Sequence, residues 1–134
     1  MASIRSSRPR VLLVDDDPRL IHIVSLYLQV QQLEVITADC GETALAHLER
    51  GLPDLVILDI MMPGIDGIEL CRRIRAMEGA ADLPVIMFTA LSSDADRELA
   101  LAAGADRVIA KPFNLTGLGG AVQAMLPDHL AASA

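Results

Sequence analysis

The sequence predicts an α/β fold, a doubly wound parallel sheet of five strands with helices on both faces. The prediction rests on the order and the composition of its segments. Five short apolar segments alternate with five longer ones in which apolar residues recur at helical spacing. The apolar segments show no polar alternation, as expected for strands that are covered on both sides. Right-handed crossovers between such strands place the helices in two layers.

The first half of the chain contains three of the expected strands and two of the helices. The strands are expected at 10–14, 33–38 and 55–59, and the helices at 18–31 and 41–50. Asp17 is a favourable N-cap, and Pro18 is a favoured first residue of the helix that follows it. Gly51 ends the second helix.

The second half continues the alternation. Helices are expected at 65–77, 94–103 and 115–126, and strands at 84–89 and 107–110. Gly104 ends the alanine-rich fourth helix. The last helix contains Gly117, Gly119 and Gly120, each of which costs roughly 1 kcal/mol relative to alanine. We therefore expect this helix to be the least stable one.

Length and composition limit the class of protein. A chain of 134 residues fits one domain, which we expect at 10–126 between a disordered leader (1–9) and a short tail (127–134). A net charge of −7 and an aromatic content of 2% argue against direct nucleic-acid binding. The sequence has neither an apolar run of the ~20 residues that span a membrane nor a signal peptide. No membrane partner and a cytoplasmic location are therefore expected.

Three arginines of the third helix, Arg72, Arg73 and Arg75, are expected on a solvated face.

Polar residues end four of the predicted strands: Asp15-Asp16, Asp59, Thr89 and Lys111. The carboxyl ends of parallel strands lie on one edge of a sheet, so these side chains are expected to converge. Carboxylates so close together repel one another and require a cation. Oxygen ligands suit Mg²⁺, and a carboxylate can itself attack phosphorus to form an aspartyl phosphate. Such a transfer depends mainly on positioning and on charge neutralisation.

Four motifs stand out in the sequence. They are Val14-Asp15-Asp16-Asp17-Pro18, Leu58-Asp59-Ile60-Met61-Met62-Pro63-Gly64-Ile65-Asp66-Gly67, Phe88-Thr89-Ala90, and Gly104-Ala105-Asp106 followed by Lys111-Pro112-Phe113. In this order and spacing, the set resembles the bacterial response-regulator receiver domain of two-component signalling. The resemblance covers about residues 10–126 and implies a flavodoxin-like fold with strand order 2-1-3-4-5.

The resemblance also implies a role for each site residue. Asp59 would be the phosphoacceptor, Thr89 would bond one phosphoryl oxygen, and Lys111 would pair with another. The bond between Lys111 and Pro112 would be cis. The implied ligands of Mg²⁺ are Asp15, Asp16, Asp59 and the backbone carbonyl of Met61. Asp17, Asp66 and Asp106 are expected to be cap or turn acids.

By this resemblance the chain accepts phosphate from a phosphohistidine of a sensor histidine kinase or a phosphotransfer protein. The chain would then catalyse only its own phosphorylation and dephosphorylation and would not otherwise be an enzyme. Phosphorylation would change the conformation of the surface around the fourth helix and fifth strand, to which an output protein that the sequence does not identify would bind. Since only 126–134 follow the fold, no output domain is expected. Met61 and Leu91 would flank the path of the water that hydrolyses the phosphoryl group. Val108 departs from the family, which usually has an aromatic there, so how the switch is read is left open.

Three alternatives compete with this interpretation. A haloacid-dehalogenase-like phosphatase would use Asp15 as nucleophile and Asp17 as acid, but its second acidic motif should come last, and a cap domain is lacking. A flavodoxin-like cofactor binder should have a first loop rich in Ser, Thr and Gly, whereas three aspartates there repel phosphate. The last alternative is an interaction module of the same fold that is never phosphorylated, against which stands the complete set of site residues.

Overall fold

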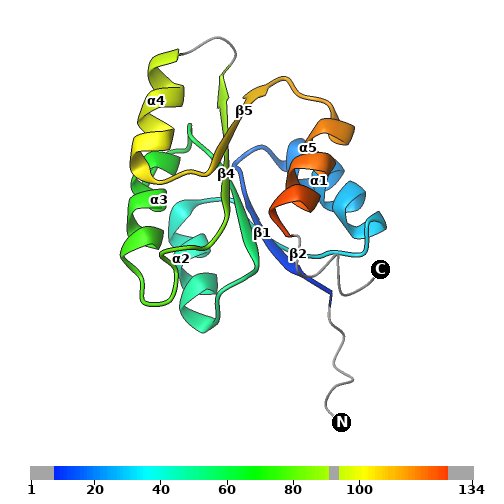
Figure 1. Cartoon of the computed structure of the whole chain (residues 1–134), viewed down its shortest axis with the longest axis horizontal. Helices are drawn as coiled ribbons and strands as arrows, with labels where there is room; N and C mark the ends of the chain where they lie inside the picture. Colours follow the sequence, from blue (N-terminus) through cyan, green and yellow to red (C-terminus); the bar gives the residue numbers. More distant parts are fainter. Residues whose placement is uncertain (1–7, 91–93, 127–134) are drawn as a thin grey trace.

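A computed structural model describes residues 8–90 and 94–126 of the chain as three layers, with a parallel sheet between two layers of helices (Figure 1). The strands are β1 (Arg10–Val14), β2 (Glu34–Ala38), β3 (Leu55–Asp59), β4 (Val85–Ala90) and β5 (Arg107–Lys111). The helices are α1 (Pro18–Val30), α2 (Gly41–Arg50), α3 (Gly67–Ala76), α4 (Asp94–Ala103) and α5 (Leu115–Met125). These bounds differ from the predicted ones by at most one or two residues.

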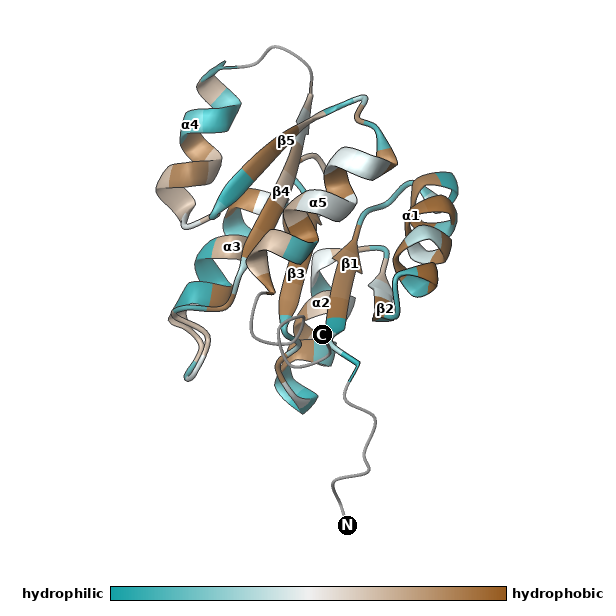
Figure 2. Ribbon diagram, turned by 45° about the vertical axis from the view of Figure 1, so that its right-hand side comes forward, coloured by the Kyte–Doolittle hydropathy of each residue, from teal (hydrophilic) through white to brown (hydrophobic). Residues whose placement is uncertain are grey.

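The strand order is β2-β1-β3-β4-β5, and every neighbouring pair is parallel. This confirms the doubly wound sheet and the order 2-1-3-4-5. The central strands are almost wholly apolar, as the brown ribbons of β1 and β3 in Figure 2 show. Both faces of these strands are covered, which is why their sequences lack polar alternation.

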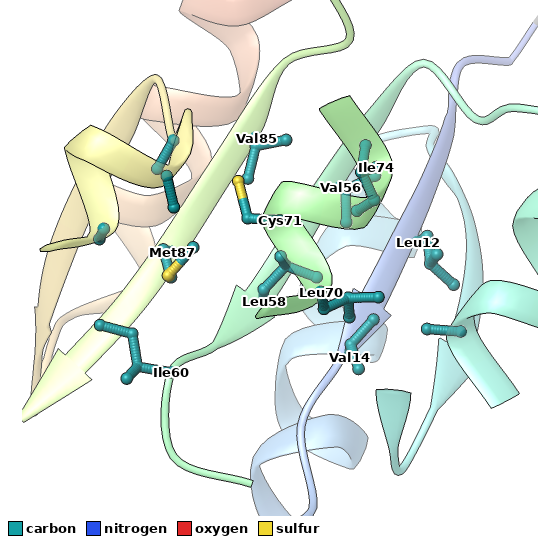
Figure 3. Packing of buried hydrophobic residues seen from close by; sticks show 14 of the residues in the cluster. Leu12, Val14, Val56, Leu58, Ile60, Leu70, Cys71, Ile74, Val85 and Met87 are labelled. Carbon is teal, nitrogen blue, oxygen red and sulfur yellow. The ribbon is translucent and has the colours of Figure 1, made fainter. Parts of the chain in front are cut away.

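Successive strand residues pack into opposite layers. Leu12, Val14, Val56, Leu58, Val85 and Met87 pack with residues of α2, α3 and α4. Figure 3 shows several of them against Leu70, Cys71 and Ile74 of α3. The alternate residues Val11, Leu13, Leu55, Ile57, Ile86 and Phe88 pack with α1 and α5. The side-chain period of two thus builds two cores, one on each face of the sheet.

The predicted caps are present. Asp17 accepts a hydrogen bond from the Arg19 N–H at the start of α1, with an N–O distance of 3.0 Å. Asp66 caps α3 in the same way by accepting from the Glu69 N–H at 2.9 Å. Both carboxylates satisfy backbone donors that a helix start leaves unpaired.

α5 packs against α1 through one of its glycines. A Cβ atom on Gly119 would lie 2.7 Å from the hydroxyl oxygen of Tyr27 and 2.8 Å from a carbon of its ring. A chain of two hydrogen bonds, from Gln123 to Gln31 and from Gln31 to Tyr27, joins the same two helices. The glycine that lowers the helix propensity of α5 therefore allows the helix to approach α1 closely.

At the N-terminal end of the described residues, Pro9 packs with the domain and is not part of a separate leader. Pro9, expected in the leader, is buried, and its carbonyl oxygen accepts from the Glu34 N–H at 2.9 Å. Residues 1–7 and 127–134, which make up the rest of the leader and the tail, lie outside the described residues. Among the residues described, no helix is both long and apolar enough to cross a membrane.

Candidate functional site

The polar strand ends meet at one edge of the sheet. Asp15 and Asp16 follow β1, Asp59 is the last residue of β3, Thr89 lies near the end of β4, and Lys111 is the last residue of β5. Because β1, β3, β4 and β5 are parallel neighbours, the register brings their ends together. The sequence-based expectation that these side chains converge is confirmed for the three acids and the lysine.

Asp15 is fully buried, and its carboxylate has two partners. One oxygen accepts from the Asp17 N–H at 2.9 Å, and the other lies 3.0 Å from Lys111 Nζ. A buried carboxylate needs such partners, because burial without them would be very costly. Asp15 is therefore fixed in place by Lys111 and by the turn that leads to α1.

Asp59 is 5% exposed and lies in the same crevice. Its Oδ1 atom is 3.4 Å from Lys111 Nζ and 3.4 Å from the Met61 nitrogen. Burial and then the negative charge of Asp15 raise the pKa of Asp59 above its ordinary value, although Lys111 and the Met61 N–H act in the opposite direction. A carboxylate with such a pKa is held in an electrostatically unfavourable position, which is common at functional sites.

Lys111 is the cation that faces both acids. Burial alone would lower the pKa of Lys111, but the hydrogen bond to Asp15 and the charges of Asp15 and Asp59 outweigh it, so that the pKa is raised. The ammonium group also lies 5.6 Å from the centre of the Phe88 ring. The bond between Lys111 and Pro112 is cis, as expected.

The three carboxylates form a group that fits a divalent cation. One oxygen from each of Asp15, Asp16 and Asp59 lies within 4.8 Å of the other two. Opposite ligands of Mg²⁺ are about 4.2 Å apart, so small movements would bring all three into its coordination sphere. Three carboxylates and one ammonium, that of Lys111, leave two negative charges, which a divalent ion would balance.

Thr89 is 4% exposed, and its hydroxyl oxygen finds no hydrogen-bond partner among the described residues. Buried polar groups are nearly always paired, so an unpaired hydroxyl at the functional edge of a sheet is notable. A hydroxyl group in this position can donate to an oxyanion that arrives in the crevice.

The chain turns tightly between Asp59, the end of β3, and Gly67, the start of α3. A Cβ atom on Gly67 would collide with the backbone oxygen of Asp59, so only glycine fits. The Gly67 N–H also donates to the Ile60 carbonyl at 2.9 Å. This contact holds the start of α3 against the end of β3. The side chain of Met61 is left 66% exposed beside the site, whereas Leu91 lies outside the described residues.

The expectation that Arg75 is solvated is wrong. Its guanidinium donates to the carbonyls of Ala80, Leu83 and Gly104 and also to the carboxylate of Asp106. Only 19% of its side chain is exposed, compared with 58% for Arg72 and 50% for Arg73. Arg75 follows the buried Cys71 by four residues, and this spacing could have placed it on the inner face of α3.

Comparison with known proteins agrees with this geometry. Residues 11–123 match the family model of the response regulator receiver domain. The chain is 42% identical over 118 residues to the phosphate regulon transcriptional regulatory protein PhoB of Rhizobium meliloti, covering 88% of the chain and 52% of that protein. It is 40% identical over 117 residues to the heme response regulator HssR of Staphylococcus haemolyticus, covering 87% and 51%. The chain thus spans about half the length of these relatives.

A solved structure shows the same fold. A response regulator described as putative, from Chloroflexus aurantiacus, superposes with a TM-score of 0.86 at 36% identity, over 90% of this chain and 98% of the other. The family match extends from β1 to α5 and includes the five polar residues at the sheet edge, Asp15, Asp16, Asp59, Thr89 and Lys111. The chain is a flavodoxin-like signalling domain and belongs to the family of response-regulator receiver domains.

Proposed function

We propose that Asp59 accepts a phosphoryl group from a phosphohistidine of a sensor histidine kinase or a phosphotransfer protein. One observation carries the proposal: a buried carboxylate lies beside a lysine and near a buried hydroxyl that has no partner among the described residues. An acid, a cation and a free donor are what an incoming phosphoryl group requires. The relatives' names support a regulatory role of this kind.

In the proposed transfer, a carboxylate oxygen of Asp59 attacks phosphorus, and the bond between phosphorus and the imidazole nitrogen of the donor breaks. The acyl phosphate remains on Asp59, and the electron pair of the broken bond leaves with the imidazole. Lys111 Nζ, already 3.4 Å from Asp59, would form an ion pair with a negatively charged phosphoryl oxygen. Thr89 would donate its hydroxyl proton to a second phosphoryl oxygen.

Mg²⁺ fits the crevice by the donors and the charge described above. Asp15, Asp16 and Asp59 would hold it through carboxylate oxygens, and Met61 would add its backbone carbonyl. When bound, the ion neutralises charge on the phosphoryl group and on the acids. The role of Asp15 is then double, because its second oxygen keeps Lys111 in place at 3.0 Å.

Phosphorylation would be read at the surface of α4 and β5. Thr89 and the start of α4 are joined by the short segment after β4, so a hydroxyl drawn towards the phosphoryl group would displace that helix. The new group brings about −1.5 to −2 charges and three acceptor oxygens. The reader is a separate output protein in this proposal, and the chain acts in the cytoplasm as a signalling domain that modifies only itself.

Labelling with a small phosphodonor tests the assignment. Incubation with acetyl phosphate and Mg²⁺ should add one acid-labile phosphoryl group, detected by intact mass. Asp59→Asn and a chelator should each abolish it, whereas Asp82→Asn, which changes an exposed acid in the loop before β4 at the opposite edge of the sheet, should not. Labelling that persists in Asp59→Asn would contradict the proposal. Turnover of p-nitrophenyl phosphate that depends on Asp15 but not on Asp59 would support the phosphatase alternative instead.

A further inference from the structure

Met61 differs from the other methionines in its exposure to solvent. Its side chain is 66% exposed. The other methionines of the described residues are buried or only partly exposed: Met62, Met77, Met87 and Met125. Methionine sulfur is oxidised to a sulfoxide more readily the more accessible it is. Within the described part of the chain, Met61 is therefore the methionine that a dissolved oxidant reaches first.

The same side chain begins beside the carboxylate of Asp59. The Met61 nitrogen is 3.4 Å from Asp59 Oδ1, so the Met61 Cα atom lies at most about 5 Å from that oxygen. Two hydrogen bonds fix the backbone of the preceding residue, because the Ile60 N–H donates to the Phe88 carbonyl at 3.0 Å and the Ile60 carbonyl accepts from the Gly67 N–H at 2.9 Å. The unbranched side chain has rotatable bonds that allow its sulfur to approach the carboxylate.

Solvent reaches Met61 through a groove of about 520 Å³ between the loop after β3 and α4. Leu99 of α4, which is 51% exposed, contributes to the lining. Two acids, Asp66 and Asp96, also line the groove, and the chain as a whole carries a net charge of −7. This negative field repels an anionic oxidant. It does not repel hydrogen peroxide, which is uncharged at neutral pH, and a peroxide is therefore the class of oxidant that the site suits.

The two cysteines are less suited to this oxidation. Cys71 is fully buried, and burial raises the pKa of its thiol, so little of the reactive thiolate is present. Cys40 is half-buried, and its sulfur lies 3.2 Å from the hydroxyl oxygen of Thr43. A sulfenic acid or a disulfide formed at either cysteine is reduced by dithiothreitol, whereas a methionine sulfoxide requires its own reductase. The two kinds of oxidation can therefore be separated by experiment.

We propose that Met61 is a site of reversible oxidation by hydrogen peroxide, and that its sulfoxide shortens the lifetime of a phosphoryl group on Asp59. In the oxidation, a lone pair of the sulfur attacks one peroxide oxygen and the O–O bond breaks. The attacking sulfur keeps that oxygen, and the second oxygen leaves as water after it takes up the proton of the first. The sulfur is oxidised by two electrons, and the peroxide is reduced by two. A methionine sulfoxide reductase that takes electrons from a dithiol reverses the change.

The sulfoxide gives Met61 a strong hydrogen-bond acceptor in place of a weak one. Its oxygen accepts a hydrogen bond from a water beside the phosphoryl group and orients that water towards phosphorus. The water oxygen bonds to phosphorus, the bond between phosphorus and the Asp59 oxygen breaks, and the electron pair of that bond returns to the carboxylate. Phosphate leaves, and one proton of the water passes to solvent. This step rests on the proposed function, since it needs a phosphoryl group on Asp59, whereas the oxidation of Met61 does not.

Peptide mass mapping tests the modification without any phosphoryl group. The protein is treated with a limiting amount of hydrogen peroxide, then reduced with dithiothreitol and digested. One added oxygen should appear on Met61 before it appears on Met77, the partly exposed methionine at the end of α3. Oxidation of Met77 that is as early as that of Met61 would overturn the inference.

The lifetime of the phosphoryl group tests the consequence. Oxidised and untreated proteins are labelled with acetyl phosphate and Mg²⁺, separated from the donor, and followed by intact mass. Oxidation should speed the loss of the label about three- to tenfold, the effect of one hydrogen bond that forms in the transition state. Met61→Leu should lose its label at the same rate with and without peroxide treatment, whereas the matched control Met77→Leu should keep the acceleration. Treatment of the oxidised protein with methionine sulfoxide reductase should restore the slow rate.

Each other result counts against the inference. It is overturned if oxidation leaves the rate of loss unchanged or lowers it, if oxidation slows only the uptake of the label, or if Met61→Leu responds to peroxide as the parent does. In all these cases the untreated protein is still labelled on Asp59, so the proposed function stands. An untreated protein that takes up no label would overturn both proposals, and this result is seen before any oxidant is added.

Discussion

Replacing Arg75 by alanine should destabilise the protein far more than the same change at its neighbour Arg73. The Arg75 guanidinium donates to the carbonyls of Ala80 and Leu83 at 3.1 and 2.6 Å, and to that of Gly104 at 2.6 Å. A buried carbonyl left without a donor costs about 1–3 kcal/mol. Ala80 and Leu83 are buried, whereas Gly104 is accessible enough for water to replace the arginine. Counting the first two gives a loss of about 3 kcal/mol in the free energy of unfolding.

Urea and thermal unfolding measure this difference directly. Among the described residues, the ion pair of Arg73 is with Glu69, at 3.0 Å and with both side chains about half exposed, and an exposed pair contributes about 0.2–1 kcal/mol. We expect Arg73→Ala to lose less than about 1 kcal/mol, and Arg75→Ala to lose roughly 10 °C in Tm. Domains of this size have 5–15 kcal/mol of stability, so both variants should fold. Equal losses in the two variants, with unchanged urea dependence, would refute the conclusion that Arg75 stabilises the fold by donating to buried carbonyls.

Three further predictions follow from other parts of the structure. Gly120→Ala should raise the free energy of unfolding by about 0.5–1 kcal/mol, because a Cβ atom there meets nothing within 4 Å; Gly119→Ala should lower it, because the new methyl group would strike Tyr27, and overpacking costs about 1–3 kcal/mol. In chelator, the raised pKa of Asp59 means that the native state binds more protons than the unfolded chain, so stability should fall as pH rises through the folded pKa. Asp59→Asn should not show this decline in stability. The two proteins would be compared by urea unfolding at a series of pH values that starts at about 3.9, the pKa of the unfolded state, and increases from there. If the proposed phosphorylation holds, Met61→Gln should shorten the lifetime of the phosphoryl group, because methionine cannot orient a water by hydrogen bonding; unchanged loss of label over time would contradict this.

The functional edge of the sheet could be predicted from the sequence because it depends on topology. Once the strands are parallel, Asp59 and Lys111 must end on the same edge, whatever the details of packing. The alternation of apolar segments and helices is strong enough to place every element within one or two residues. The same rule predicts that Asp15 and Lys111 lie at this edge. It does not predict that they form an ion pair with a distance of 3.0 Å.

Features that depend on how surfaces meet were not predictable in this way. The helix propensity of Gly119 predicts a cost, but the effect of this glycine is decided by Tyr27, which is 92 positions earlier in the chain and on another helix. The charge of Arg75 predicts a solvated side chain, but three of its partners are backbone carbonyls, which every residue has and which no sequence pattern marks. In each case the contact joins residues whose identities alone do not require it.

The two ends of α4 differ in what holds them, and this bears on the proposed switch. At its carboxyl end, the Gly104 carbonyl accepts two hydrogen bonds from Arg75, and Asp106 joins Arg75 to the Val85 N–H at the start of β4. The amino end of α4 follows β4, the strand that carries Thr89, and lies at the same edge of the sheet as Asp15 and Asp59. A displacement that begins at Thr89 therefore meets resistance at Gly104, and the helix should tilt about that end instead of sliding along the sheet. Arg97 is in the first half of the helix, on the moving side, so a tilt would change its distance from the Val108 carbonyl of β5, to which it donates a hydrogen bond at 3.4 Å.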